Sequence, residues 1–285
     1  MKANKIKTLN EENLLFIEKV FAKHSDLQGA LIASANSPRN CGLFEFLSGN
    51  RRPLIASIHE SEWHPHCVYT RLAYDLDEPD LQLLQFCIEF LRDEIDKPLF
   101  FLLDDRFNAL ASILVEFGFQ MIRKTEVVHI QPATHHRSDT PLTTVAQISE
   151  NVDCMNSLVE ISKRTYTETH VSNPVGNHPF QSWREVVLDG LLLDYSYVVL
   201  DGEKVLAFSL LYEGEENNWE LGWVGADINS NLYLLDAILA RQLAGAKENN
   251  IAFIEKEVDS TCPYSLHICK SVPYEVVETL FAYVN

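Results

Sequence analysis

The sequence predicts a mixed α/β protein of two tandem domains, each with a central mixed sheet flanked by helices. Helical and strand patterns alternate along the chain, and one order of patterns occurs twice. The glycines of two expected hairpin turns, Gly49 and Gly202, lie 153 residues apart, and the aromatic residues at two expected closing strands, Phe119 and Tyr274, lie 155 apart. A spacing kept so closely over a series of elements indicates an internal duplication.

The first copy is expected to contain a helix, a hairpin, a strand, a long helix, a buried strand, and a short helix that runs into a closing strand. These elements cover, in order, residues 11–24, 43–59, 67–76, 80–95, 98–105 and 111–130. The hairpin is predicted because apolar strands flank a turn that contains glycine. The long helix is predicted from apolar residues at helical spacing, namely Leu81, Leu84, Ile88 and Leu91.

The second copy repeats this order. Its elements are expected over residues 148–168, 196–212, 218–227, 231–249, 251–259 and 257–284, and its long helix has apolar residues at Leu235, Ile238, Leu239 and Leu243. Polar and turn-forming residues replace the apolar pattern over residues 131–144. The expected domains are therefore 1–132 and 145–285, joined by a linker over 133–144.

Composition narrows the class of protein. The net charge of −18 disfavours nucleic-acid binding, because such a chain repels phosphate backbones and has no basic stripe. The sequence has no run of about 18 apolar residues and no signal-peptide pattern at its N-terminus, so we expect no membrane association. Six cysteines without a CxxC pair suit free thiols in a cytoplasmic protein.

Two other kinds of site are disfavoured. The stretch WHPHC, residues 63–67, supplies two histidines and a cysteine, but no further ligands stand at a useful spacing, so no metal site is predicted. The sequence also has no Gly-x-Ser-x-Gly elbow for nucleophilic catalysis.

Three segments carry a resemblance to a known family. Residues 111–130, ASILVEFGFQMIRKTEVVHI, are similar to a signature in which a short helix with an A-L-x-L-Y-x-x-x-G-F pattern runs into a final strand. Residues 257–284 look like a looser version of it, and residues 166–187 resemble a loop that frames an acceptor site. Together with the element order, these segments resemble the GNAT acyltransferase superfamily, here as a tandem pair.

The resemblance implies transfer of an acetyl group from acetyl-CoA to a primary amine of a small molecule or peptide. The second copy is the expected acyl-CoA domain, the first copy is expected to be degenerate, and a homodimer is compatible with this expectation. A pyrophosphate would bind main-chain amides at a helix N-terminus. The residues implied are Val224, Gly225, Ala226, Asn229, Ser230 and Asn231 for the cofactor, and Tyr166, His170 and Trp183 for the acceptor. An inter-domain contact is the alternative role for the last three.

Glu220 is the expected general base, because it lies on the strand WELGWV that would border the acyl site. Trp219, Leu221 and Trp223 alternate with it, so the carboxylate is expected on the opposite face of the strand from both tryptophans. A carboxylate placed so could accept a proton from the attacking ammonium through a water molecule. The alternative is that Glu220 is a cross-strand partner or an exposed strand charge without a catalytic role.

The chain departs from the family pattern at the groups that bind phosphate and protonate the thiolate. No Lys or Arg stands between residues 222 and 240, and the expected tyrosine is replaced by Leu114 in the first copy and Cys269 in the second. In the first copy, acids stand where the phosphate loop is expected, at Asp75, Asp77, Glu78 and Asp80. These departures favour an alternative function, a non-catalytic GNAT-fold module for ligand binding or protein association.

Overall fold

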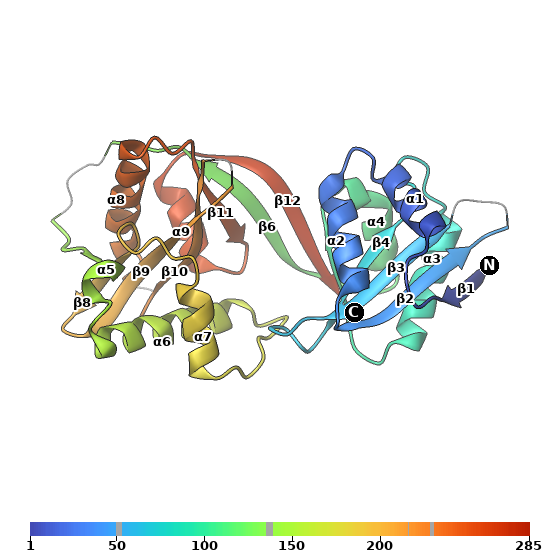
Figure 1. Cartoon of the computed structure of the whole chain (residues 1–285), viewed down its shortest axis with the longest axis horizontal. Helices are drawn as coiled ribbons and strands as arrows, with labels where there is room; N and C mark the ends of the chain where they lie inside the picture. The colour runs from blue at the N-terminus through green and yellow to red at the C-terminus, as the bar shows by residue number, and fades with distance from the viewer. Residues whose placement is uncertain (50–52, 135–138, 216, 229–230) are drawn as a thin grey trace. The chain divides into compact units, whose positions relative to one another are not determined.

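The computed structural model describes residues 1–49, 53–134, 139–215, 217–228 and 231–285. The chain folds into two compact units (Figure 1). Unit 1 consists of Met1–Arg123, Ser172–Gly176 and Leu280–Asn285, and unit 2 of Lys124–Val171 and Asn177–Thr279. No helix in these described ranges is long and apolar enough to cross a membrane.

Unit 1 is a sheet with helices on its faces. Its sheet has the order β1-β2-β3-β4-β5-β12, in which β4 and β5 are parallel and the other pairs are antiparallel. The strands are β1 (Lys2–Lys5), β2 (Asn40–Leu47), β3 (Leu54–Glu60), β4 (Val68–Ala73) and β5 (Leu99–Leu103), together with the end of β12 (Tyr274–Val284). The helices are α1 (Glu11–Val20), α2 (Ser25–Asn36), α3 (Leu81–Glu94), the 3-10 turn η1 (Asp105–Phe107) and α4 (Asn108–Glu116).

Unit 2 has the same plan. Its sheet order is β6-β11-β10-β9-β8-β7, and the only parallel pair described in it is β10 with β11. The strands are β6 (Gln120–Ile130), β7 (Thr143–Thr144), β8 (Tyr197–Asp201), β9 (Lys204–Glu213), β10 (Trp219–Ala226) and β11 (Ile254–Asp259). The helices are α5 (Val145–Ile148), α6 (Val152–Thr169), α7 (Phe180–Leu188), α8 (Leu234–Glu248) and α9 (Pro263–Ser271).

Two buried clusters separate the faces of the unit 2 sheet. One contains α8 and α9 residues such as Ile238 and Ile268 with Trp219 and Ile254, and the other contains α6 residues such as Leu158 with Phe208 and Leu210. Residues at successive positions of a strand point to opposite faces. The cluster to which a side chain of β10 or β11 belongs therefore shows on which face of the sheet that side chain lies.

The closing strands are exchanged between the two halves of the sequence. β6 follows α4 along the chain but pairs antiparallel with β11, from Thr125↔Asp259 to Ile130↔Ile254. β12 follows α9, yet its end pairs antiparallel with β5 of unit 1, from Phe281↔Leu103 to Val284↔Phe100. Each unit thus takes one strand from the other half of the sequence. The domain limits 1–132 and 145–285 stay a prediction, and residues 135–138 of the expected linker lie outside the described residues.

The expected fold class is confirmed as a mixed α/β architecture built twice. The first predicted helix, residues 11–24, is α1 and ends at Val20, and it is followed by a second helix, α2, that the sequence analysis did not predict. Asn10 caps α1 and accepts a hydrogen bond from the Asn13 N–H, while the Asn13 side chain bonds back to Asn10. Such reciprocal bonds satisfy donors that a helix start leaves free.

Candidate functional site

The strands β10 and β11 pair only at their beginnings. The parallel ladder between them covers Trp219↔Ile254 and Glu220↔Glu255, whereas β10 continues along β9 to Ala226 and β11 continues along β6 to Asp259. Beyond Glu220 the backbone of β10 has no ladder partner in β11. Unpaired N–H and C=O groups of this kind can bind a linear ligand with amide groups. Unit 1 repeats the feature, because β4 and β5 pair only at Val68↔Leu99 and Tyr69↔Phe100.

A β-bulge changes the side-chain pattern of β10. The register with β9 shifts between Leu221 and Trp223, so Gly222 is an extra residue in the strand. Trp219 stays in the buried cluster with α8, but Trp223 packs near Tyr166 and Trp183 on the α6 face. The expectation that both tryptophans lie opposite Glu220 was wrong for Trp223, because simple alternation does not hold across a bulge. A Cβ at Gly222 would lie 2.7 Å from the ring of Tyr212, so this bulge requires glycine.

Glu220 is exposed and lies directly opposite Tyr212 of β9 and beside Glu255 of β11. Burial, and secondarily the charge of Glu220, raises the pKa of Tyr212, whose hydroxyl donates to the Val187 carbonyl at 2.7 Å. Glu220 therefore stands on the α6 face of the sheet, at the last residue pair before β10 and β11 part. Its role as a base stays a prediction.

Lys256 brings a buried ammonium group to the place where the strands part. It alternates with Ile254 and Val258, which belong to the α8–α9 core, and it is only 6% exposed. Its Nζ donates to the carbonyl of Gly222 at 3.3 Å. A buried ammonium has three donors to satisfy. The position was not singled out from the sequence, where IEKEVD reads as an ordinary charged strand.

Tyr264 is a second group that the sequence analysis missed. It lies in the first turn of α9, is 4% exposed, and donates its hydroxyl to Glu168 Oε2 of α6 at 3.4 Å. Burial, and then the charge of Glu168, raises the pKa of the phenol to about 12. The family pattern had directed attention to Cys269 instead, and burial raises the pKa of that thiol to about 11. Both groups therefore keep their protons at neutral pH, and the Cys269 thiol is the slightly stronger acid.

The three expected acceptor residues lie together. The ring of Tyr166 stacks on His170 with centroids 3.9 Å apart, and it meets Trp183 edge-on at 5.6 Å. Trp223 completes the group at 5.0 Å from Tyr166. His170 Nδ1–H donates to the Tyr166 carbonyl at 2.8 Å, and His170 Nε2 lies 4.0 Å from Asp259 Oδ2. We call Tyr166, His170, Trp183 and Trp223 the aromatic cluster; whether it binds an acceptor stays a prediction.

The expected cofactor residues of β10 are held tightly on the α6 side. Val224, Gly225 and Ala226 pair with β9, and a Cβ at Gly225 would lie 2.7 Å from Phe208 and 2.8 Å from Thr165. The Ala226 carbonyl accepts a hydrogen bond from Arg164 Nη2 at 3.2 Å. The strand therefore lies directly against α6, and the cofactor roles of these three residues stay a prediction.

The loop after β10 carries a carboxylate. Asp227 accepts hydrogen bonds from Asn231 Nδ2 at 2.6 Å and from Lys204 Nζ at 2.7 Å. Burial alone would raise the pKa of Asp227, but these two bonds lower it below its usual value. The expected cofactor residues Asn229 and Ser230 lie outside the described residues.

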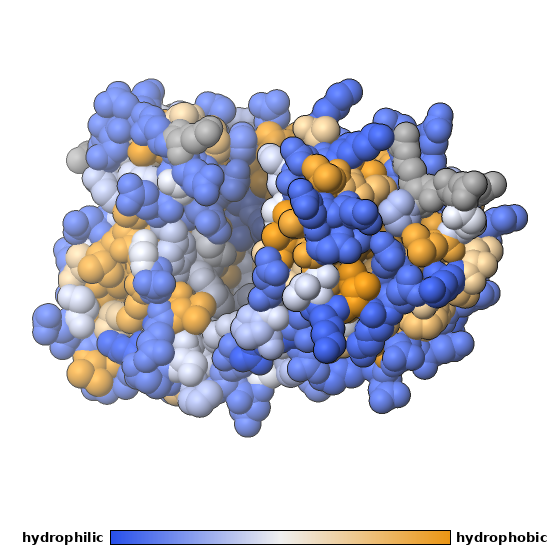
Figure 2. All heavy atoms as spheres, turned by 45° about the vertical axis from the view of Figure 1, so that its right-hand side comes forward, coloured by the Kyte–Doolittle hydropathy of each residue, from blue (hydrophilic) through white to orange (hydrophobic). Residues whose placement is uncertain are grey.

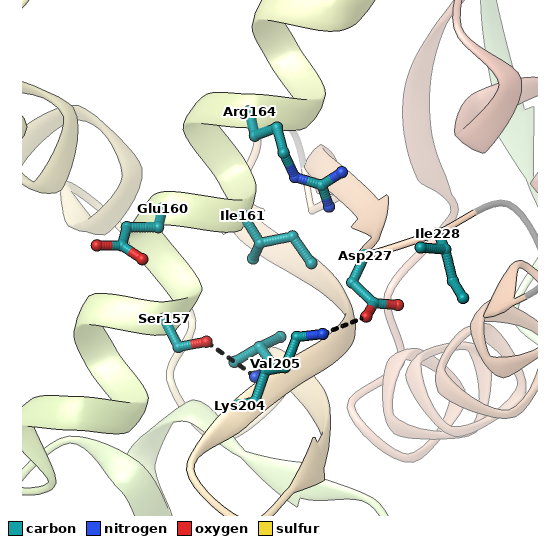
Figure 3. A pocket seen from close by; sticks show the side chains of 8 residues that line it. All are labelled: Ser157, Glu160, Ile161, Arg164, Lys204, Val205, Asp227 and Ile228. Atoms are coloured by element: carbon teal, nitrogen blue, oxygen red, sulfur yellow. Dashed lines mark hydrogen bonds and ion pairs between the residues drawn. The ribbon is translucent and has the colours of Figure 1, made fainter.

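A pocket of about 340 Å³ lies beside this loop (Figure 3). Its lining comes from α6, β9 and the loop after β10: Ser157, Glu160, Ile161, Arg164, Lys204, Val205, Asp227 and Ile228. Arg164 and Lys204 bring positive charge that the segment 222–240 lacks in its own sequence, while Glu160 and Asp227 balance it. Lys204 is already bound to Asp227, and Arg164 lies 3.4 Å from Glu168.

The WHPHC stretch of unit 1 takes part in hydrogen bonds of that unit. His64 Nδ1–H donates to the Asn173 carbonyl at 2.8 Å, and the Gly176 N–H donates to the Trp63 carbonyl at 2.7 Å. Among the described residues there is no group of three or more His, Cys, Asp or Glu side chains that could hold a metal ion. Residues 172–176, expected as part of an acceptor loop, belong to unit 1 in this structure.

Solved structures with this architecture cover the whole chain. A GCN5-related N-acetyltransferase from Sphaerobacter thermophilus matches with a TM-score of 0.62 and 10% identity, over 100% of this chain and 95% of the other. A GNAT-family acetyltransferase from Colwellia psychrerythraea matches with a TM-score of 0.54 and 9% identity, over 100% and 99%. A tandem GNAT protein from the clavulanic acid biosynthesis pathway matches with a TM-score of 0.56 and 10% identity, over 100% and 98%.

Comparison of the sequence with protein-family models and with curated proteins gave no match. The chain therefore has the fold of the GNAT N-acetyltransferases in a two-copy arrangement, as the sequence predicts, with sequence identity at the level where fold alone is shared.

Proposed function

We propose that unit 2 transfers an acetyl group from acetyl-CoA to a primary amine of a small molecule or peptide. The observation that carries this proposal is the separation of β10 and β11 after Glu220, where Lys256 donates to the Gly222 carbonyl of β10 and Tyr264 donates to Glu168 of α6. The unpaired backbone of β10 suits the two amides of a pantetheine arm. The fold shared with N-acetyltransferases supports the same reaction class.

The reaction needs two proton transfers. The amine nitrogen attacks the thioester carbonyl, its N–H proton passes to the Glu220 carboxylate through water, and the tetrahedral intermediate then breaks its carbon–sulfur bond. The departing thiolate takes the phenolic proton of Tyr264. The aromatic cluster would bind the apolar part of the acceptor. A cytoplasmic location and a homodimer belong to the same proposal.

A second candidate function follows from the loop after β10. Asp227 stands at the start of the segment expected to hold a pyrophosphate, and no Lys or Arg occurs from residue 222 to 240. A carboxylate there opposes phosphate binding. This favours a non-catalytic module that keeps the fold to bind another ligand or a protein.

Calorimetry with acetyl-CoA and CoA separates the two functions. We expect saturable binding of both at millimolar concentration or below, and a gain in affinity for Asp227→Asn, which removes the opposing charge. Glu18→Gln, which removes an exposed carboxylate of α1 in unit 1, serves as the control for the same change of net charge. No binding of either ligand at millimolar concentration excludes the acyltransferase.

Glu220→Gln is expected to lower turnover about 10²- to 10⁴-fold with little change in acetyl-CoA affinity, because general-base catalysis contributes on that order. The assay is initial-rate kinetics with a panel of primary amines. Glu255→Gln, which changes the neighbouring carboxylate across the parallel pair, is the matched control and should retain turnover. Unchanged turnover in Glu220→Gln would remove Glu220 from the mechanism.

A further inference from the structure

The strands β3 and β4 of unit 1 carry a polar cluster on one face. Ser57 lies directly opposite Arg71, and His59 lies directly opposite Tyr69. Residues two apart on a strand share a face, and opposite residues of an antiparallel pair share it too. The four side chains therefore stand together, and the rings of His59 and Tyr69 have centroids 5.6 Å apart.

The neutral members of this cluster are held by hydrogen bonds. Ser34 of α2 bonds to His59 Nδ1 at 2.8 Å and to Ser57 Oγ at 2.7 Å. The Tyr69 hydroxyl accepts a bond from Asn173 Nδ2 at 3.1 Å. Ser34 and Ser57 are both buried. The cluster is thus an ordered polar site and not a loose surface patch.

Arg71 differs from its neighbours. In the part of the chain that the structure describes, its guanidinium makes no hydrogen bond and no ion pair; its electrostatic neighbours are Tyr69 and His59. Burial lowers its pKa, and burial and then the charge of Arg71 lower the pKa of His59. Arg123 adds further positive charge near Tyr69. Arg71 is half-buried, and a charge partly removed from water without a counterion has a desolvation cost.

The missing counterion is notable because acids are abundant in this chain, which has 41 Asp and Glu against 23 Lys and Arg. The exposed Arg39, in the same unit, has Glu62 at 2.7 Å. No carboxylate of the described residues forms a hydrogen bond or an ion pair with Arg71, His59 or Tyr69. The positive charge of Arg71 is therefore not balanced by a paired carboxylate, and an anion from outside the chain would balance it.

The duplication shows which residues of unit 2 correspond to this polar cluster. In unit 2, Tyr212 lies opposite Glu220 and Leu210 lies opposite Trp223. With the 153-residue spacing of the hairpin glycines, Ser57 and His59 correspond to Leu210 and Tyr212, so Arg71 corresponds to Trp223. The first copy therefore carries a guanidinium where the second copy carries part of its aromatic cluster.

We propose that Arg71, with Tyr69 and His59, forms a binding site in unit 1 for a small oxyanion, a carboxylate or a phosphate group of a small molecule. A guanidinium binds two oxygens of such a group through paired N–H donors, and the strands and Ser34 hold its neighbours in place. The site does not depend on the acyltransferase function of unit 2.

The test compares Arg71→Met with Arg39→Met by thermal unfolding in malonate, in inorganic phosphate, and in sodium chloride of equal ionic strength. In the wild type and in Arg39→Met, malonate or phosphate should raise Tm beyond the chloride effect and to a plateau. Arg71→Met should lose that rise and, without added anion, be at least as stable as wild type, because a costly charge is gone. Which of the two anions acts identifies the oxyanion.

A second measurement does not depend on a variant. NMR titration of His59 in the wild type should give a higher imidazole pKa when the anion is bound, because the anion offsets the Arg71 charge that lowers it. The proposal is overturned if neither malonate nor phosphate moves the His59 pKa, or if Arg71→Met responds to both anions as the wild type does.

Discussion

Tyr264→Phe is expected to lower acetyl transfer about 10²- to 10⁴-fold while the protein keeps its fold and its affinity for CoA. The substitution removes one oxygen atom, and with it the proton that the departing thiolate would take. The change in shape is small because the ring stays, and the lost hydrogen bond to Glu168 is long, at 3.4 Å. The measurement is single-turnover kinetics beside calorimetry with CoA.

The phenol of Tyr264 should also affect how the stability of the protein depends on pH. Because burial raises its pKa from 10 to about 12 in the folded state, the stability linked to the phenolic proton is present below pH 10 and is lost as pH rises toward 12. The wild type should therefore lose more stability over this range than Tyr264→Phe. This comparison tests the environment of the phenol even where no acceptor is known.

Tyr274→Phe is the matched control, since Tyr274 is 42% exposed at the start of β12. Tyr274→Phe should change neither turnover nor the loss of stability between pH 10 and pH 12. Turnover of Tyr264→Phe within a few-fold of wild type would show that the phenol is not the acid. Lys256, whose ammonium donates to Gly222 beside the same backbone, would then be the next group to replace.

The fold could be predicted where local periodicity decides it. The apolar spacing of Leu81, Leu84, Ile88 and Leu91 became α3, with all but the exposed Leu81 in the core. The strand exchange could not be predicted, because β6 and β12 satisfy the same pairing rules with either partner. The partner of each strand is decided by the whole fold and leaves no local mark in its sequence.

Part of the candidate site could be predicted, because some of its residues are close together in the sequence. Tyr166, His170 and Trp183 were found because they cluster in sequence around one loop and also cluster in space. Tyr264 was missed because a motif fixed the expected position of its hydroxyl five residues later, at Cys269. The face of Trp223 was mistaken because a bulge at Gly222 leaves no mark in the sequence beyond one glycine in a strand.

Trp183→Ala is expected to lower the free energy of unfolding of unit 2 by about 3–5 kcal/mol, the usual cost of removing a buried large aromatic side chain. Trp183 is 0% exposed and contacts Tyr166 and Trp223 edge-on, so its removal opens a cavity between α6, α7 and β10. A loss of this size is a large share of the 5–15 kcal/mol that is typical of a folded domain.

Urea unfolding followed by tryptophan fluorescence and circular dichroism measures the loss, with Phe180→Ala on the same helix as control. Phe180 is 37% exposed, so its removal should cost about 1 kcal/mol or less. Trp183→Phe separates packing from acceptor binding: a ring without the indole N–H should restore much of the stability. If stability returns but the KM for the amine stays high, the indole acts on the acceptor. If both return together, Trp183 serves the site through packing, by fixing the Tyr166 ring that faces His170.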